Sequence, residues 1–112
     1  MKSILWIMAA IGCNAAAQVA LKLGASTELA RWQTWLSPAI LAGLGLYGAS
    51  FILTVRVYAD YPLGLISPIM AGAIFFLINV LSALVFNEPV TLDKLLGMVL
   101  IVAGIALLSR SI

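Results

Sequence analysis

The chain has 112 residues, 64% of them hydrophobic and only 9% charged, with a formal net charge of +2, whereas an ordinary soluble domain carries about 25% charged residues. This composition excludes a water-soluble catalytic domain, and the scattered Lys and Arg residues do not form the basic tract of a nucleic-acid surface. The absence of His and the single Cys leave out the commonest general base, an intrachain disulfide and a thiolate metal cluster, so we expect no enzyme, no cofactor and no metal site.

Four long apolar stretches follow one another, each near the length that a helix needs to cross a bilayer. They are residues 3–23, 35–58, 64–86 and 92–109. Helices satisfy their backbone polar groups within one segment, and the alternating strands of a barrel are absent. We therefore predict an all-α bundle of four transmembrane helices, packed as antiparallel neighbours in a single membrane domain over residues 1–112. The first stretch is interpreted as a span rather than a cleaved signal peptide.

The first span carries polar residues at a helical spacing. Asn14, Gln18 and Lys22 recur every four residues, which places two amides and an ammonium on one face. Polar groups are costly in lipid and usually face a bundle interior or a wet cavity. Two interpretations stay open: the face lines a cavity that binds a substrate head group, or the amides join helices while Lys22 extends to the water interface.

The second span is rich in glycine and ends near a guanidinium. Gly43, Gly45 and Gly48 indicate close helix packing. Arg56 near the end of this span either marks the water interface or binds a phosphate, for which its planar donors are well suited.

The third and fourth spans each hold a feature of interest. Ser67 precedes Pro68, four residues inside the third span, where a local kink or break is expected. It is either a passive kink or an interruption of the kind at which transporters often bind and flex. Gly97 and Gly104 lie on nearly one face of the fourth span, which begins after Thr91, a candidate cap. This smooth face is interpreted either as a dimer interface or as packing within the chain.

The Lys and Arg residues give no orientation bias. With four spans, one side holds Lys2, Arg56 and Arg110, and the other holds Lys22, Arg31 and Lys94. Either copies insert both ways and pair as an antiparallel homodimer, or a partner chain or an uneven weighting of the charges sets the orientation.

The acidic residues all fall in or beside connections. They are Glu28, Asp60, Glu88 and Asp93. A proton-driven exchanger generally needs a carboxylate buried in the membrane, so this pattern argues against that mechanism.

Several segments resemble known families. NEPVTLDKLLGMVLIVAGIALLS, residues 87–109, resembles the end of an EamA-type repeat of the drug/metabolite transporter superfamily, and its two glycines are similar to the dimerising helix of small multidrug resistance proteins. AQVALK (17–22), YPLGLISPI (61–69) and NEPVT (87–91) resemble the small subunits of the aminoarabinose-phosphoundecaprenol flippase. Small multidrug exporters place a functional glutamate where this sequence has Asn14.

The resemblance implies a multi-pass protein of the bacterial inner membrane that translocates a polyprenyl-phosphate-linked sugar or a similar amphipathic lipid by alternating access. It implies a homodimer, or a heterodimer with a similar small subunit. Asn14, Gln18 and Ser67 would contact the head group, and Lys22 or Arg56 the phosphate. Two alternatives stay open, an exporter of cationic drugs and a membrane subunit that scaffolds a larger partner without transport.

Overall fold

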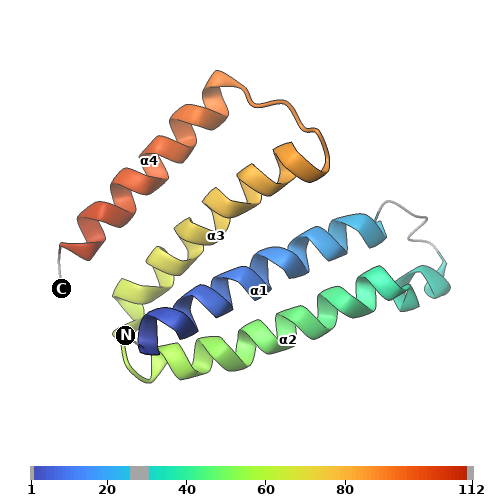
Figure 1. Ribbon diagram of the computed structural model, residues 1–112, viewed down its shortest axis with the longest axis horizontal. Coiled ribbons are helices and arrows are strands. Elements are labelled where there is room, and N and C mark those ends of the chain that lie inside the picture. Colours follow the sequence, from blue (N-terminus) through green and yellow to red (C-terminus); the bar gives the residue numbers. More distant parts are fainter. Residues whose placement is uncertain (1, 26–30, 111–112) are drawn as a thin grey trace. The chain divides into compact units, whose positions relative to one another are not determined.

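The computed structural model describes residues 2–25 and 31–110 (Figure 1). The described chain forms four α-helices, α1 (Lys2–Ala25), α2 (Pro38–Tyr58), α3 (Leu63–Val85) and α4 (Leu92–Ser109), with the short 3₁₀ helix η1 (Trp32–Leu36) before α2. Each α-helix is long and apolar enough to cross a membrane. The predicted all-α class with four membrane-spanning helices is thereby confirmed.

The start of the second span differs from the prediction. The apolar stretch was expected to form a helix from residue 35, but α2 begins at Pro38. Proline is well suited to the first helical position because it has no N–H to leave unpaired there. The Ser37 hydroxyl accepts a 3.3 Å hydrogen bond from the Ile40 backbone nitrogen, which caps the new helix. Residues 26–30 of the predicted first connection lie outside the described part of the chain.

The chain divides into two compact units, the first ending at Val57 and the second beginning at Tyr58. In Figure 1, α1 and α2 run side by side in opposite directions, and so do α3 and α4. Each unit is therefore a helical hairpin, as the short predicted connections require. The single membrane domain over residues 1–112 stays a prediction.

The first hairpin closes along one line of buried residues, which we call the α1–α2 seam. Its members are Ala10, Ala17 and Gly24 in α1, and Gly43, Ser50 and Val57 in α2. Each set recurs every seven residues and so stays on nearly one helix face. Helices in lipid gain little from the hydrophobic effect when they pair, so small side chains that admit close backbone approach supply the packing.

Two contacts fix the antiparallel register of this seam. The Ser50 hydroxyl, which is 3% exposed, donates a 3.0 Å hydrogen bond to the Ala10 carbonyl oxygen. Further along, a Cβ added at Gly43 would lie only 3.2 Å from the Ala17 carbonyl oxygen. Glycine and serine are thus placed where α2 lies against the backbone of α1.

Replacing Ser50 by alanine is expected to destabilise the first hairpin by about 0.5–1 kcal/mol, because one interhelical hydrogen bond is lost without a change in packing volume. Thermal unfolding in detergent micelles measures the effect. Ser109→Ala is the matched control, since that hydroxyl bonds to the Ile105 carbonyl within its own helix. Equal losses of stability in the two variants would contradict an interhelical role for Ser50.

The second hairpin packs through Gly72 of α3. A Cβ there would lie 2.6 Å from the Ile105 Cδ1 atom and 3.1 Å from the Ile101 Cγ2 atom of α4. The turn between the helices passes through Asn87, whose φ of 53° is tolerated by asparagine better than by most residues. Thr91 then caps α4 by accepting a 3.2 Å hydrogen bond from the Lys94 backbone nitrogen, as its sequence position predicts.

Pro68 does not break the third span. A kink or break was expected there. The break is wrong, because α3 continues as one helix from Leu63 to Val85 through this proline, and the kink stays a prediction. Pro68 lies in the second turn of the helix, where the loss of one N–H donor affects a single hydrogen bond near the end of the ladder.

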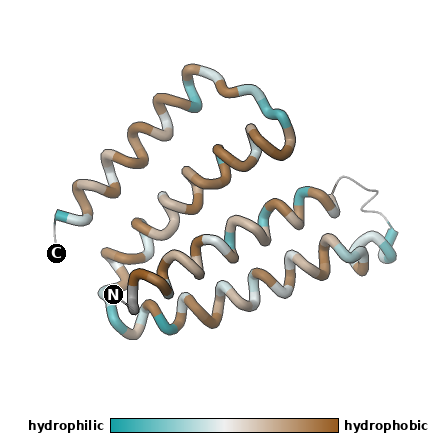
Figure 2. Tube along the Cα trace, viewed as in Figure 1, coloured by the Kyte–Doolittle hydropathy of each residue, from teal (hydrophilic) through white to brown (hydrophobic). Residues whose placement is uncertain are grey.

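Large apolar side chains are exposed along the helices. Phe51, Leu84 and Leu100 are 71%, 73% and 72% exposed. Figure 2 shows hydrophobic colouring along the helices and hydrophilic colouring mainly at turns and helix ends. Such surfaces are stable in hydrocarbon and not in water. The chain is therefore a multi-pass membrane protein.

Candidate functional site

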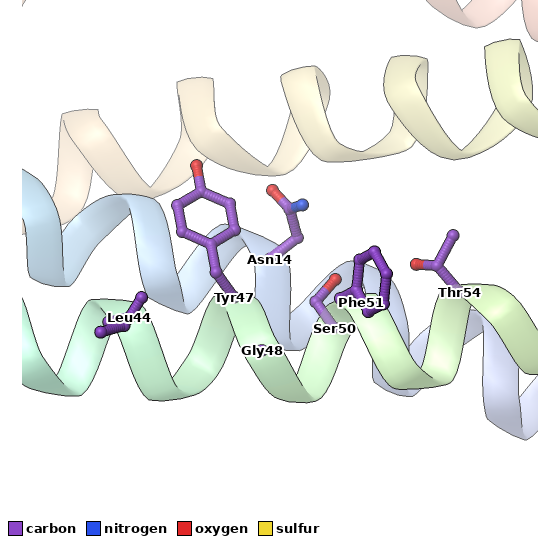
Figure 3. Close-up of a pocket in the computed structure, with 7 residues that line it drawn as sticks. All are labelled: Asn14, Leu44, Tyr47, Gly48, Ser50, Phe51 and Thr54. Carbon is purple, nitrogen blue, oxygen red and sulfur yellow. The ribbon is translucent and has the colours of Figure 1, made fainter.

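A groove of about 500 Å³ runs along the first hairpin. Its lining residues are Asn14, Leu44, Tyr47, Gly48, Ser50, Phe51 and Thr54, and Figure 3 shows their side chains. Asn14 comes from α1 and all the others come from α2. Ser50 belongs both to this lining and to the α1–α2 seam, so the groove follows one flank of the seam.

The groove lies near the middle of both helices. The register of the seam puts Asn14 of α1 level with Tyr47 of α2, and each lies close to the midpoint of its helix. A helix that spans the hydrocarbon core has its central residues near the bilayer midplane. Polar side chains at this depth are costly, and they commonly mark a substrate pathway.

A hydrogen bond orients the amide of Asn14. The Gln18 Nε2 atom, one turn along α1, donates a 2.8 Å hydrogen bond to the Asn14 Oδ1 atom. This bond satisfies an acceptor of Asn14 and leaves its Nδ2 amino group to donate elsewhere. Two of the predicted site residues are thus brought into contact, with Gln18 positioning Asn14.

The other predicted site residues do not line this groove. Lys22 and Arg56 are exposed and lie toward opposite ends of the hairpin, eight residues beyond Asn14 in α1 and two residues before the end of α2. Ser67 is half-buried on α3, in the second unit. Their roles in binding remain predictions.

The sequence analysis did not select the polar residues of α2 as site residues. Tyr47, Ser50 and Thr54 recur at intervals of three and four, the spacing of one helical face. The same periodicity singled out the α1 amides. Applied to α2, it would have identified three of the four polar lining residues.

All seven lining residues are neutral, so none of them would provide a counter-ion for a charged group in the groove. The aromatic rings of Tyr47 and Phe51 can attract a cation, but such contacts contribute about 2 kcal/mol even when desolvated. Removing an ion from water costs at least several kcal/mol when no counter-ion is present. The groove therefore suits groups that form hydrogen bonds without carrying charge.

A second groove, of about 330 Å³, lies on the second hairpin. Its lining is wholly apolar and consists of Phe76, Leu95, Met98, Val99 and Val102. On α4 this face is opposite to Gly97 and Gly104, because the glycines are offset by about half a turn at 3.6 residues per turn. A Cβ on either glycine would meet no atom within 4 Å, so they do not close the packing of α3 on α4.

Three relatives show what the chain is similar to. It is 31% identical over 77 residues to the uncharacterized protein y4nH of Sinorhizobium fredii, an alignment of 69% of this chain and 66% of that protein. It is 43% identical over 79 residues to the "Probable 4-amino-4-deoxy-L-arabinose-phosphoundecaprenol flippase subunit ArnE" of Pseudomonas aeruginosa, covering 69% and 61% of the two chains. The chain thus spans just under two thirds of these relatives.

The third relative is matched along nearly its full length. The multidrug resistance protein EbrA of Bacillus licheniformis is 30% identical over 107 residues, which are 96% of this chain and 95% of that protein. No protein-family model matches the sequence. No solved structure matches it either. The second and third relatives are named as a flippase subunit and a multidrug resistance protein, which supports a small membrane transporter rather than an enzyme.

Proposed function

The chain belongs to the small multidrug resistance family of four-helix membrane transporters, and from that premise we propose that it translocates a polyprenyl-phosphate-linked sugar or a similar amphipathic lipid across the bacterial inner membrane. The observation that carries this proposal is the groove at mid-membrane depth, whose lining is uncharged and includes the Asn14 amide and three hydroxyl groups. A groove of this kind shelters a head group while the lipid tail stays in the bilayer. The 43% identity to a named flippase subunit supports the same substrate class.

The cationic side chains at the two ends of the first hairpin would receive the phosphate. Lys22 lies toward the C-terminal end of α1 and Arg56 toward that of α2, so in an antiparallel hairpin they approach opposite membrane surfaces. Charge-assisted hydrogen bonds from such groups are the usual means of holding a phosphate. One cation would thus act at each side, with Asn14 and Gln18 contacting the head group between them. Ser67, in the second unit, stays a predicted head-group contact.

The working unit we propose is a dimer, either of two copies of this chain or with a similar small subunit. Gly97 and Gly104 form a smooth face on α4 that nothing in the described chain covers within 4 Å of a Cβ. Small residues are the usual surface through which helices associate in lipid. Two hairpin pairs related by a two-fold axis would allow access to alternate sides.

Reconstituted vesicles test the proposal. Purified protein is expected to speed the movement of a fluorescent polyprenyl-phosphate-glucose between leaflets, measured by quenching from the outside. Lys22→Gln and Arg56→Gln are each expected to slow this movement about tenfold, the effect of one lost charge-assisted hydrogen bond. Arg110→Gln, beyond α4, is the control. A wild-type protein that moves no lipid would overturn the function, and unaltered rates in both variants would overturn the phosphate role.

Export of cationic drugs is the second candidate, and the near-complete alignment with a multidrug resistance protein favours it. The exporter hypothesis predicts that a cationic aromatic drug drives proton release from loaded vesicles. Asn14 argues against this, because an amide carries no exchangeable charge. Proton release by the wild-type protein would replace the lipid proposal with this one.

A further inference from the structure

We infer that the groove on the first hairpin recognises the uncharged, hydroxyl-rich part of its cargo, such as a sugar ring, through Asn14, Tyr47 and Thr54, and discriminates against both cations and anions. The inference rests on the proposed function in taking this groove as the cargo site. Tyr47 and Thr54 of α2 are thereby proposed as contact residues beside Asn14.

Asn14 provides a donor of fixed direction. Its oxygen accepts the hydrogen bond from Gln18, so rotation of the amide would break that 2.8 Å bond. Figure 3 shows the Asn14 nitrogen on the side of Thr54 and its oxygen on the side of Tyr47. The Asn14 amino group is therefore expected to donate to an acceptor oxygen of the cargo on that side. The Thr54 hydroxyl would contact a different cargo atom, because the register of the seam separates it from Asn14 by about two helical turns.

The hydroxyl groups of α2 differ in the hydrogen bonds that they can form with a ligand. The Ser50 hydroxyl already donates its proton to the Ala10 carbonyl oxygen, so it can act toward a ligand only as an acceptor. Tyr47 and Thr54 lie on the same flank of the seam, and each offers both a proton and lone pairs. Sugar hydroxyls are themselves both donors and acceptors, so this mixture matches a sugar better than it matches a phosphate or an ammonium.

Because the lining residues carry no formal charge, moving an ionic group from water into the groove costs more free energy than moving a neutral polar group. A phosphate or an ammonium at mid-membrane depth would face seven neutral side chains and lose its hydration without a counter-ion. A sugar exchanges hydrogen bonds to water for hydrogen bonds to the protein. Ionic parts of the cargo are therefore expected at the hairpin ends.

Binding of three amphiphiles that share one alkyl tail tests the inference. Dodecyl glucoside, dodecyl phosphate and dodecyltrimethylammonium carry neutral, anionic and cationic head groups. Each is titrated at concentrations below micelle formation into wild-type protein in lipid nanodiscs, and binding is followed by intrinsic fluorescence. The glucoside is expected to bind at least about tenfold more tightly than either ionic amphiphile. Equal or tighter binding of an ionic amphiphile would overturn the inference.

Variants that keep shape but remove polarity locate the contacts. Tyr47→Phe and Thr54→Val are each expected to weaken glucoside binding about three- to tenfold, the usual effect of one lost hydrogen bond, without changing binding of the ionic amphiphiles. Ser109→Ala removes a hydroxyl outside the groove and should change nothing. Unaltered glucoside affinity in both α2 variants would overturn their assignment.

Asn14→Asp keeps the size of the side chain but introduces a charge. The preference is expected to reverse, with dodecyltrimethylammonium binding at least about tenfold more tightly than in the wild type and the glucoside more weakly. Retained preference for the glucoside would contradict a groove that selects by charge. If the wild type shows the preference yet moves no lipid in vesicles, transport is refuted and the inference stands. If the wild type moves lipid but shows no preference for the glucoside, the proposed function stands and the inference about the groove is refuted.

Discussion

Gly43→Val is expected to destabilise the first hairpin by about 1–3 kcal/mol, the usual cost of forcing extra methyl groups into a packed interface. A Cβ at this position would lie 2.7 Å from the Leu21 Cδ2 atom, 3.0 Å from its Cγ atom and 3.2 Å from the Ala17 carbonyl oxygen. The leucine tip can rotate away, but the carbonyl belongs to the backbone of α1 and cannot. The two helices would have to separate along the seam.

Gly45→Val is the matched control for this prediction. It makes the same substitution two residues along α2, where an added Cβ meets no atom within 4 Å. Unfolding of both variants in detergent, followed by circular dichroism, should show a loss for Gly43→Val and little change for Gly45→Val. Similar losses would mean that intrinsic helix propensity, not packing against α1, sets the requirement for glycine.

Loss of the groove should accompany the loss of stability. Ser50 lies seven residues after Gly43 on the same seam, and its hydroxyl bonds to α1. Separation of the helices at Gly43 would therefore disturb the level at which Asn14 and Tyr47 meet. Glucoside binding by Gly43→Val is expected to fall even at temperatures where its helix content is unchanged.

The four spans were predictable because length and apolarity alone decide them. Every predicted span overlaps an observed helix, and the largest boundary difference, at Pro38, follows from local chemistry. The 3₁₀ helix Trp32–Leu36 continues the apolar run, and hydropathy cannot distinguish it from the start of a membrane helix. The preference of proline for the first helical position was the sequence feature that could have placed the start of α2 at Pro38.

The candidate site was only half predictable. Periodicity placed Asn14 and Gln18 on one face, and the structure joins them by a hydrogen bond. A single sequence does not contain the register between α1 and α2, however, so it could not place Tyr47 level with Asn14 or show that Thr54 lines the same groove. That register depends on which small residues meet across the seam, a tertiary property that a single helical pattern does not contain.

Gly97→Val combined with Gly104→Val is expected to weaken the proposed dimer about a hundredfold, or roughly 3 kcal/mol, because two branched side chains would hold apart backbones that must approach closely. The double substitution leaves the hairpin itself intact, since an added Cβ at either glycine meets no atom within 4 Å. Energy transfer between labelled copies, measured on dilution in micelles, gives the dissociation constant.

The control for this prediction is Ala103→Val, which adds a branched side chain to the same helix about a third of a turn away from the glycine face. Ala103 is exposed, as that position requires. Dimerisation should persist in Ala103→Val and be lost in the double glycine variant, while helix content is the same in both. Undiminished association of the double variant would mean that the dimer interface lies on another face of the chain. The apolar groove on the second hairpin would be the next candidate, because it lies on the opposite side of α4.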